Sequence, residues 1–248
     1  MKHRKSPDDI DAMRRSGAIL ADTMSRLEEA VRPGVTTAAL DELAHETIAA
    51  AGAEPSFKGY RGYPSSICIS PNDVIVHGIP GSNWLEESDI VSVDVGVLFR
   101  GWHADSAWTW PVGAIDSTAA ELLKVTEASL YAALDQCEPG RRLGDVGWAV
   151  EQMADESGFS VVREYAGHGI GRQLHEELWV PNYGPPGRRE VLRPGMTFAV
   201  EPMLNLGGPD TRTLEDGWTV VTADGSMSAH FEHTVAITAD GHEILTGR

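Results

Sequence analysis

The sequence predicts an α+β fold in which one α–α–β unit occurs twice. Amphipathic segments with apolar residues three and four positions apart come in two pairs, and β-branched segments follow each pair. Several positions also match at an offset of 106 residues: Pro33-Gly34 corresponds to Pro139-Gly140, and Gly52 corresponds to Gly158. The shared order of helix, Pro-Gly turn, helix, glycine and strands indicates an internal duplication.

The duplication predicts a single domain over residues 1–248, with halves of roughly residues 6–110 and 117–248. No low-complexity linker separates these halves. We therefore expect them to be related by a pseudo-two-fold axis, with a cleft between two halves of a curved antiparallel sheet and helices behind it.

The helices of each half have recognisable ends. Ser6-Pro7 followed by acidic residues is a typical helix start, because serine caps the first turn, proline suits it and acids favour the positive end of the helix dipole. Pro33-Gly34 ends this helix, and a second one begins at Thr36 or Thr37 and ends at Gly52. In the other half, the same signals predict helices over residues 117–136 and 144–156.

β-branched residues predict the strands. The segment from Ser65 to Val76 reads as a strand, and residues 89–110 read as a hairpin that turns at Arg100-Gly101. Two later segments, residues 196–203 and 229–237, each read as a strand that carries one carboxylate among apolar residues.

Composition and charge exclude several classes of protein. With 42% hydrophobic and 23% charged residues, the chain is neither disordered nor collagenous. No apolar run approaches the roughly 18–20 residues of a membrane span, and the basic start is not followed by the apolar core of a signal peptide. We therefore expect a soluble, cytoplasmic protein.

A formal net charge of −17 opposes binding to nucleic-acid phosphates and favours bound cations. The two cysteines, Cys68 and Cys137, form no CxxC motif, so neither a cysteine zinc site nor a redox motif is predicted, and a reducing compartment fits.

Asp94 lies inside the apolar segment IVSVDVGV, where a carboxylate is costly unless it is paired or binds a metal. If Arg100-Gly101 is a two-residue turn, Asp94 lies opposite Ala107, and Asp105 falls on the same face at a Cβ distance of roughly 7 Å. Two carboxylates so close together favour a shared cation. The alternatives are a three-residue loop, which would put them on opposite faces, or two solvent-facing acids.

His168 lies between two glycines in YAGHGIGRQLHEE. The segment is not a dinucleotide loop, because Arg172 stands where the third glycine would fall, and it lacks the second histidine of a zincin helix. The flanking glycines indicate a close approach to the backbone. By itself, a histidine in such a strand is more often structural than a ligand.

Two further acids, Glu201 and Glu232, occupy similar apolar settings. Either could form an ion pair, but basic residues near them are few. Together with Asp94 and Asp105 they carry four negative charges, which two divalent cations would neutralise. Four carboxylates and one imidazole suit Mn, Fe, Co or Zn, and the residues alone do not choose among these metals.

Five motifs in order, GYPSSICISPNDVIVHGIP, DVGVLFRGWHAD, GHGIGRQLHEE, GMTFAVEPM and FEHT, resemble those of the type I methionine aminopeptidases. The resemblance runs from about Ser6 to the C-terminus and implies the pita-bread fold, whose two αβ halves agree with the duplication. Glu201 follows His168 by 33 positions, which leaves no room for the large helical insert of type II enzymes. The resemblance therefore implies removal of the initiator methionine before a small second residue.

The resemblance also implies a dinuclear metal site. Its ligands would be Asp94, chelating one ion; Asp105 and Glu232, bridging both ions; and His168 and Glu201, completing the other shell. A metal-bridging hydroxide would attack the first peptide bond, with Glu201 accepting the proton.

Two histidines outside the metal shell match catalytic positions of the family. His175 would donate to the carbonyl oxygen as it becomes an oxyanion, and His77 would hydrogen-bond the substrate backbone. Without the resemblance, His77 would be read as a turn residue before Gly78. His233 would at most support Glu232 from outside the shell.

The family's methionine pocket corresponds to six residues: Phe57, Tyr60, Tyr63, Cys68, Leu174 and Trp218. Phe57 stands where some members have cysteine, Leu174 replaces a frequent aromatic residue, and Arg61 stands at the rim where a histidine often occurs. These changes keep the slot apolar and alter its shape. Plain core packing is an alternative for Phe57 in particular.

The resemblance further implies a monovalent cation near Asn72, Val74 and Ser228, and nascent polypeptide N-termini as substrates. We expect a monomer that binds neither DNA nor membranes. The basic clusters Lys2–Lys5 and Arg188-Arg189 could make a transient ribosome contact, but as solvated charges they need no partner.

Two other functions remain open at this point. An X-Pro dipeptidase or creatinase shares the fold, but usually has a long N-terminal domain and a different histidine motif. A metal-free binding protein on the same fold would have lost at least one ligand, whereas all five ligand positions carry the expected residue types.

Overall fold

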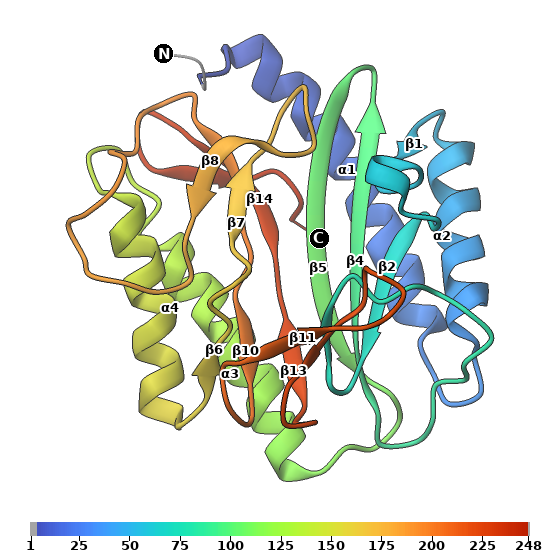
Figure 1. Ribbon diagram of the computed structural model, residues 1–248. Helices are drawn as coiled ribbons and strands as arrows, with labels where there is room; N and C mark the ends of the chain where they lie inside the picture. Colours follow the sequence, from blue (N-terminus) through green and yellow to red (C-terminus); the bar gives the residue numbers. More distant parts are fainter. Residues whose placement is uncertain (1–3, 248) are drawn as a thin grey trace.

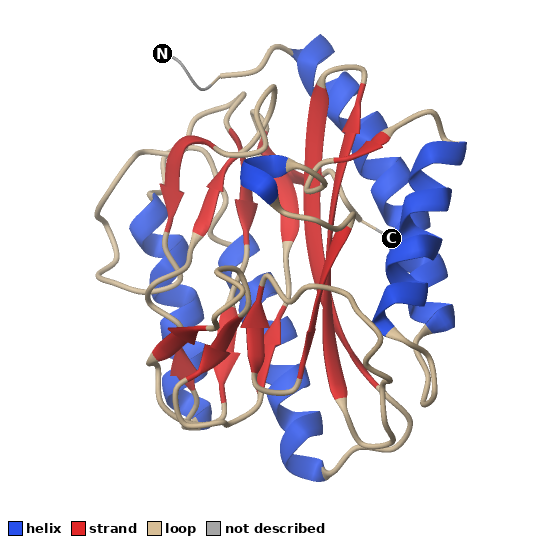
Figure 2. Ribbon diagram, turned by 45° about the vertical axis from the view of Figure 1, so that its right-hand side comes forward, coloured by secondary structure: helices blue, strands red, loops and turns tan. Residues whose placement is uncertain are grey.

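Two helix pairs flank the central strands on opposite sides of the molecule (Figures 1 and 2). The computed structural model describes residues 4–247, so Lys2 and His3 of the N-terminal basic cluster lie outside the described residues. The first helix begins as predicted: Ser6 caps it, and Ser6 and Asp9 form a reciprocal capping box. The helices are α1 (Pro7–Ala30), α2 (Thr37–Ala50), α3 (Ser117–Leu134) and α4 (Leu143–Ser157).

The two helix pairs are tied to the rest of the chain by matching hydrogen bonds. After α1, Gly34 N donates to Leu85 O at 2.8 Å; after α3, Gly140 N donates to Leu192 O at 2.9 Å. Both glycines have positive φ, +83° and +93°, which glycine adopts without steric cost. The same backbone turn therefore joins the helices of each pair.

The first half contributes an antiparallel sheet of order β1-β4-β2, with β5 added to β4. The predicted strand from Ser65 to Val76 is wrong as a single element: it divides at Asn72, which has φ +54° and turns the chain. The strands are β1 (Glu54–Pro55), β2 (Ile67–Pro71), β3 (Val74–Val76), β4 (Ile90–Phe99) and β5 (Trp102–Pro111), and the 3-10 turn η1 (Tyr60–Gly62) lies between β1 and β2.

The β4–β5 hairpin has the predicted register. Arg100 and Gly101 both have positive φ, the geometry of a two-residue turn, and Asp94 pairs with Ala107. Asp105 pairs with Gly96, two positions along on the same face as Asp94. The odd-numbered valines of β4 pack against α1 and α2, so the opposite face of β4 carries Asp94.

The second half contributes a sheet of order β15-β14-β9-β7-β8 and a smaller one of order β13-β10-β6; a third sheet, β11-β12-β3, joins strands of both halves. The strands are β6 (Ser160–Val161), β7 (Gly167–Gly169), β8 (Glu176–Val180), β9 (Thr197–Val200), β10 (Met203–Asn205), β11 (Thr211–Thr213), β12 (Val220–Thr222), β13 (Ser228–His230), β14 (His233–Ile237) and β15 (His242–Ile244).

Glu201 and Glu232 do not lie inside strands, and the prediction that they do is wrong. Glu201 follows the end of β9, and Glu232 precedes β14. The two breaks face each other: Val200 pairs with His233 before them and Met203 with His230 after them, in one continuous register. Pro202 has no N–H to donate, so the ladder cannot be complete at this point. In this register Glu201 lies opposite Glu232.

A seam of hydrogen bonds joins the halves along β5. The Thr234 hydroxyl accepts from Asp105 N at 2.9 Å and donates to Asp105 O at 2.8 Å. Glu232 N donates to Ala107 O at 2.8 Å, and the Ser106 hydroxyl donates to Glu232 O at 2.6 Å. The backbone of Glu232 is therefore positioned by the other half of the molecule. Among the described residues, no helix combines the length and the apolar character needed to cross a membrane.

Candidate metal centre

A cavity of about 190 Å³ lies between the two halves. It is lined by every residue predicted to act in catalysis, to bind the divalent metals or to form the methionine pocket. These are Phe57, Tyr60, Tyr63, Cys68, His77, Asp94, Asp105, His168, Leu174, His175, Glu201, Trp218 and Glu232. Residues that are as much as 175 positions apart in the chain thus share one site.

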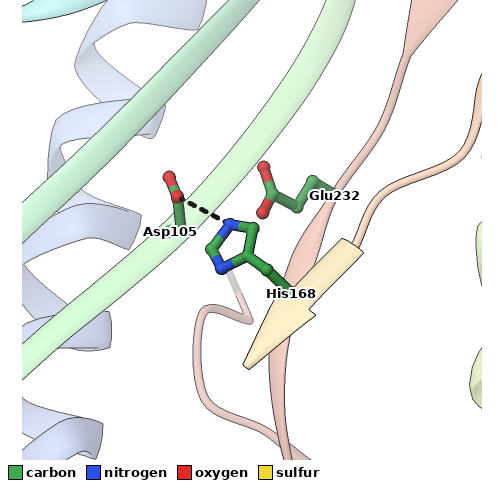
Figure 3. A group of neighbouring side chains, drawn as sticks. All are labelled: Asp105, His168 and Glu232. Atoms are coloured by element: carbon green, nitrogen blue, oxygen red, sulfur yellow. Dashed lines mark ion pairs between the residues drawn. The ribbon is translucent and has the colours of Figure 1, made fainter. Parts of the chain in front are cut away.

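His168 lies at the centre of the acidic group. Its Nε2 is 3.6 Å from an Asp105 carboxylate oxygen and 3.6 Å from a Glu201 oxygen. Asp105, His168 and Glu232 each offer one ligand atom within 4.8 Å of the others. Figure 3 shows the three side chains converging from β5, from β7 and from the segment just before β14. The Asp94 carboxyl contacts that of Asp105. This is the spacing of groups that share a cation.

Backbone contacts orient the imidazole. His168 Nδ1 donates to Gly169 O at 3.0 Å, which turns Nε2 toward the acids. The close approach predicted from the flanking glycines is present: a Cβ on Gly167 would lie 2.2 Å from Ala199 O of β9. The neighbouring strand, rather than a ligand, requires this glycine.

Burial disfavours the charged form of the four carboxyls. Burial raises the pKa of Asp105 and of Glu201 to about 8, and burial together with the neighbouring acids raises the pKa of Asp94 and Glu232 well above the usual range. One buried oxygen each of Asp94, Asp105 and Glu232 has no hydrogen-bond partner. Bound divalent ions would satisfy these oxygens and allow the carboxyls to ionise, so the donor set fits them.

The two predicted catalytic histidines both line the cavity and contact different side chains. The His175 ring centroid is 4.0 Å from that of His168, and its Nδ1 is 2.9 Å from the Tyr60 hydroxyl. His77 has φ +60° and makes edge contacts with the rings of Tyr165 and Trp218. Burial lowers the pKa of both histidines, so both favour the neutral imidazole.

The apolar part of the cavity is built by the first half, by the loop that follows β7 and by Trp218, which lies between β11 and β12. Phe57 occupies space that a side chain on Gly96 would fill, since a Cβ there would lie 2.6 Å from its ring. The Tyr63 hydroxyl donates to Gly78 O at 2.9 Å, which holds its ring beside Trp218 at a centroid distance of 5.1 Å. Cys68 and Leu174 are buried. The result is a slot with aromatic, thiol and aliphatic walls.

Two lining residues, Tyr165 and Ala166, were not predicted to belong to the site. Tyr165 and Ala166 directly precede Gly167-His168, so adjacency to the histidine motif was the available signal. Arg61 was expected at the rim, and it lies there in a left-handed conformation with φ +48° and its guanidinium 5.3 Å from the Tyr60 ring centroid.

Two of the residues expected near a monovalent cation, Asn72 and Ser228, come together at a second place. Ser228 N donates to Asn72 O at 2.8 Å, which joins the turn between β2 and β3 to β13. Asn205, which pairs with Ser228, keeps a buried amide oxygen without a hydrogen-bond partner.

Residues 11–239 match metallopeptidase family M24. The chain belongs to this family. It is 50% identical to methionine aminopeptidase 1 of Bacillus subtilis over 242 residues, which cover 98% of each chain. It is 45% identical to the methionine aminopeptidase of Escherichia coli over 246 residues, 98% of this chain and 93% of that protein. Within family M24, these full-length relatives group the chain with the methionine aminopeptidases.

Solved structures agree with this grouping. A methionine aminopeptidase crystal structure from Thermotoga maritima superposes with a TM-score of 0.98 and 43% identity, covering both chains completely. The prolidase of Pyrococcus furiosus has a TM-score of 0.81 at 20% identity, with 66% of that chain covered. The second likeness establishes the shared pita-bread fold alone.

Proposed function

We propose that this protein removes the initiator methionine from nascent proteins and peptides whose second residue is small. The observation that carries the proposal is one cavity in which the five candidate metal ligands, two further histidines and an apolar slot meet. The methionine aminopeptidases to which the chain is 45–50% identical over nearly its whole length support the same substrate.

Two divalent ions, Co, Mn, Fe or Zn, would be held by Asp94, Asp105, His168, Glu201 and Glu232. When bound, the ions supply a water of lowered pKa and polarise the peptide carbonyl.

Glu201 acts as the base of the reaction. Its carboxyl is at the cavity wall beside His168, and once the cations let it ionise it can accept the proton of the attacking water. Its main-chain carbonyl accepts from Asn182 Nδ2 at 2.9 Å, which holds the residue in the break after β9. This hydrogen bond holds the main chain of Glu201 in place and leaves the carboxylate available to accept a proton.

His175 supplies a hydrogen bond to the developing oxyanion. His175 Nδ1 lies 2.9 Å from the Tyr60 hydroxyl. In the tautomer in which Nδ1 accepts from that hydroxyl, the proton of the neutral ring is on Nε2, from which it can be donated to the substrate carbonyl. His77 hydrogen-bonds the substrate backbone near the scissile bond. The methionine side chain enters the slot of Phe57, Tyr60, Tyr63, Cys68, Leu174 and Trp218.

A monovalent cation near Asn72, Val74 and Ser228 would brace the turn between β2 and β3. The unpaired buried oxygen of Asn205 beside Ser228 supports a cation at this place. We further propose that the protein works as a cytoplasmic monomer, that it touches the ribosome only transiently, and that it binds neither DNA nor membranes.

The test is hydrolysis of Met-Ala-Ser by the purified chain. We expect cleavage after Met, its loss on complete chelation and its return with Mn, Co, Fe or Zn. An X-Pro peptide is the control substrate. Cleavage of X-Pro but not Met-Ala, or activity that survives complete removal of metal, would reject the proposal. Metal analysis of protein purified without added metal would identify the ion.

A further inference from the structure

The loop between β7 and β8 carries both Leu174 and His175, and a buried ion pair closes its base. Lys5 Nζ lies 2.5 Å from Glu176 Oε2, and the two side chains are only 7% and 15% exposed. The other oxygen of the same carboxylate accepts from Arg172 N at 3.1 Å. One oxygen of Glu176 thus binds the backbone of Arg172 within the preceding loop, and the other binds Lys5 in the N-terminal segment.

Lys5 is itself fixed on both sides. Its N–H donates to Gly195 O at 2.6 Å, and Arg4 forms a β-bridge with Met196 immediately before β9. Ser6, the next residue, is the cap of α1. The segment Arg4–Ser6, here called the N-terminal strap, therefore connects α1, the start of β9 and the loop that carries His175.

The backbone at Gly171 is shaped to admit this ion pair. A Cβ on Gly171 would lie 2.4 Å from Lys5 Cε, 2.5 Å from a Glu176 oxygen and 2.7 Å from Lys5 Nζ. The space that a side chain would occupy is filled by the pair itself. Gly171 O also accepts from His103 N at 2.9 Å, which attaches the loop to the tip of the β4–β5 hairpin.

We propose that the Lys5–Glu176 ion pair is a positioning device that holds His175 in register with the metal centre. His175 Nδ1 contacts the hydroxyl of Tyr60, which lines the cavity. The next residue, Glu176, is held by its ion pair with Lys5, and neither Glu176 nor Lys5 lines the cavity. The inference rests on the proposed function, because it assigns His175 a hydrogen bond to the reacting carbonyl. Loss of the charge on Lys5 shifts the loop and misplaces that donor.

The test compares Lys5→Met, which keeps the length of the side chain and removes its charge, with Lys5→Arg and Glu176→Gln. Lys124→Met is the matched control, since Lys124 pairs with Glu121 on an exposed helix surface. We expect Lys5→Met to lower kcat for Met-Ala-Ser by about ten- to one hundredfold with KM nearly unchanged. Lys5→Arg should recover most of the loss, Glu176→Gln should lose less than Lys5→Met, and the control should match the parent.

A double-mutant cycle separates positioning from general destabilisation. In a His175→Ala background, Lys5→Met should change kcat less than about twofold, because the donor it positions is gone. Equal loss of kcat in both backgrounds, or no loss in the parent, overturns the inference. Should Lys5→Met fail to fold, Glu176→Gln takes its place in the cycle.

A second readout does not depend on catalysis. Hydrogen exchange at the Arg172 amide should be at least about tenfold faster in Lys5→Met than in the Lys124→Met control. If the parent protein does not cleave Met-Ala-Ser, the proposed function fails. Unchanged hydrogen exchange at Arg172 in Lys5→Met is the separate result that overturns the positioning role of the Lys5–Glu176 ion pair.

Discussion

In the first half, β4 and β5 run for ten residues each, and their acids lie diagonally on one face of an unbroken hairpin. In the second half, the corresponding acids lie opposite each other in the break of the ladder, where Glu201 follows the end of β9 and Glu232 precedes the start of β14. The hairpin positions Asp94 and Asp105 by its own register. The broken ladder instead relies on β5: Glu232 N bonds to Ala107 O, and Thr234 binds both backbone groups of Asp105.

The difference shows two ways to place a buried carboxylate. An unbroken strand uses side-chain alternation and leaves the backbone ladder complete. A break releases backbone groups, which must find partners elsewhere. Those of Glu232 find them on β5 across the seam, and the carbonyl of Glu201 finds Asn182 within its own half. Glu232 therefore depends on the first half for its backbone partners, whereas the hairpin register alone sets Asp94 and Asp105 on one face, and the following experiments test this difference.

The largest effect is expected at the break. Glu201→Gln keeps the shape of the side chain but removes the proposed base, so kcat for Met-Ala-Ser should fall by about 10²- to 10⁴-fold. Circular dichroism should show an intact fold. Glu243→Gln, at an ion pair with Arg14 on the surface, is the control and should retain full turnover. Normal turnover of Glu201→Gln would show that the base has been wrongly assigned.

Metal removal should lower the protection against hydrogen exchange more in the second half than in the first. Four buried carboxyls lose their counter-ions on chelation, and saturating metal at one hundred times its Kd stabilises a folded protein by about 2.7 kcal/mol. We expect a lower melting temperature after chelation and faster hydrogen exchange at Phe231-Glu232 than at Asp94 or Asp105. Equal protection of the two halves in the stripped protein would contradict the proposed dependence on the seam.

Thr234→Val tests the seam directly. The substitution leaves Asp105 N and Asp105 O without their partner, so the free energy of unfolding should fall by about 1–3 kcal/mol. Thr126→Val is the matched control: Thr126 is also buried, but its hydroxyl bonds only to the carbonyl four residues back in α3, and its loss should cost little. Urea unfolding of both variants gives the comparison. Equal losses would mean that the seam is no stronger than an ordinary buried hydroxyl contact.

The smallest effect should be equal in the two halves. Gly34→Ala and Gly140→Ala each place a side chain at positive φ with no neighbouring atom within 4 Å of the new Cβ. Each should lower the free energy of unfolding by about 1–2 kcal/mol, with turnover unchanged. A difference of more than about 1 kcal/mol between the two variants in thermal unfolding would show that the helix pairs are not equivalent.

Much of the fold could be predicted because its signals are local. Ser6-Pro7, the Pro-Gly turns and Gly52 mark helix ends through backbone chemistry that needs no tertiary partner. The Arg100-Gly101 turn determines the hairpin register, so the shared face of Asp94 and Asp105 followed from counting. The motifs around His168, Glu201 and Glu232 identified the candidate ligands, and the family comparison supports that reading of the chain.

The sequence by itself indicated which residues are candidates for the chemistry and determined where helices begin and end, because capping, turns and side-chain alternation act over a few residues. The tertiary structure alone decided where strands stop and which distant groups meet. Glu201 and Glu232 read as strand residues, since nothing local shows that their backbone bonds go to Asn182 and to β5. The pairing of Lys5 with Glu176 likewise spans 171 positions, and such contacts depend on packing of the whole chain.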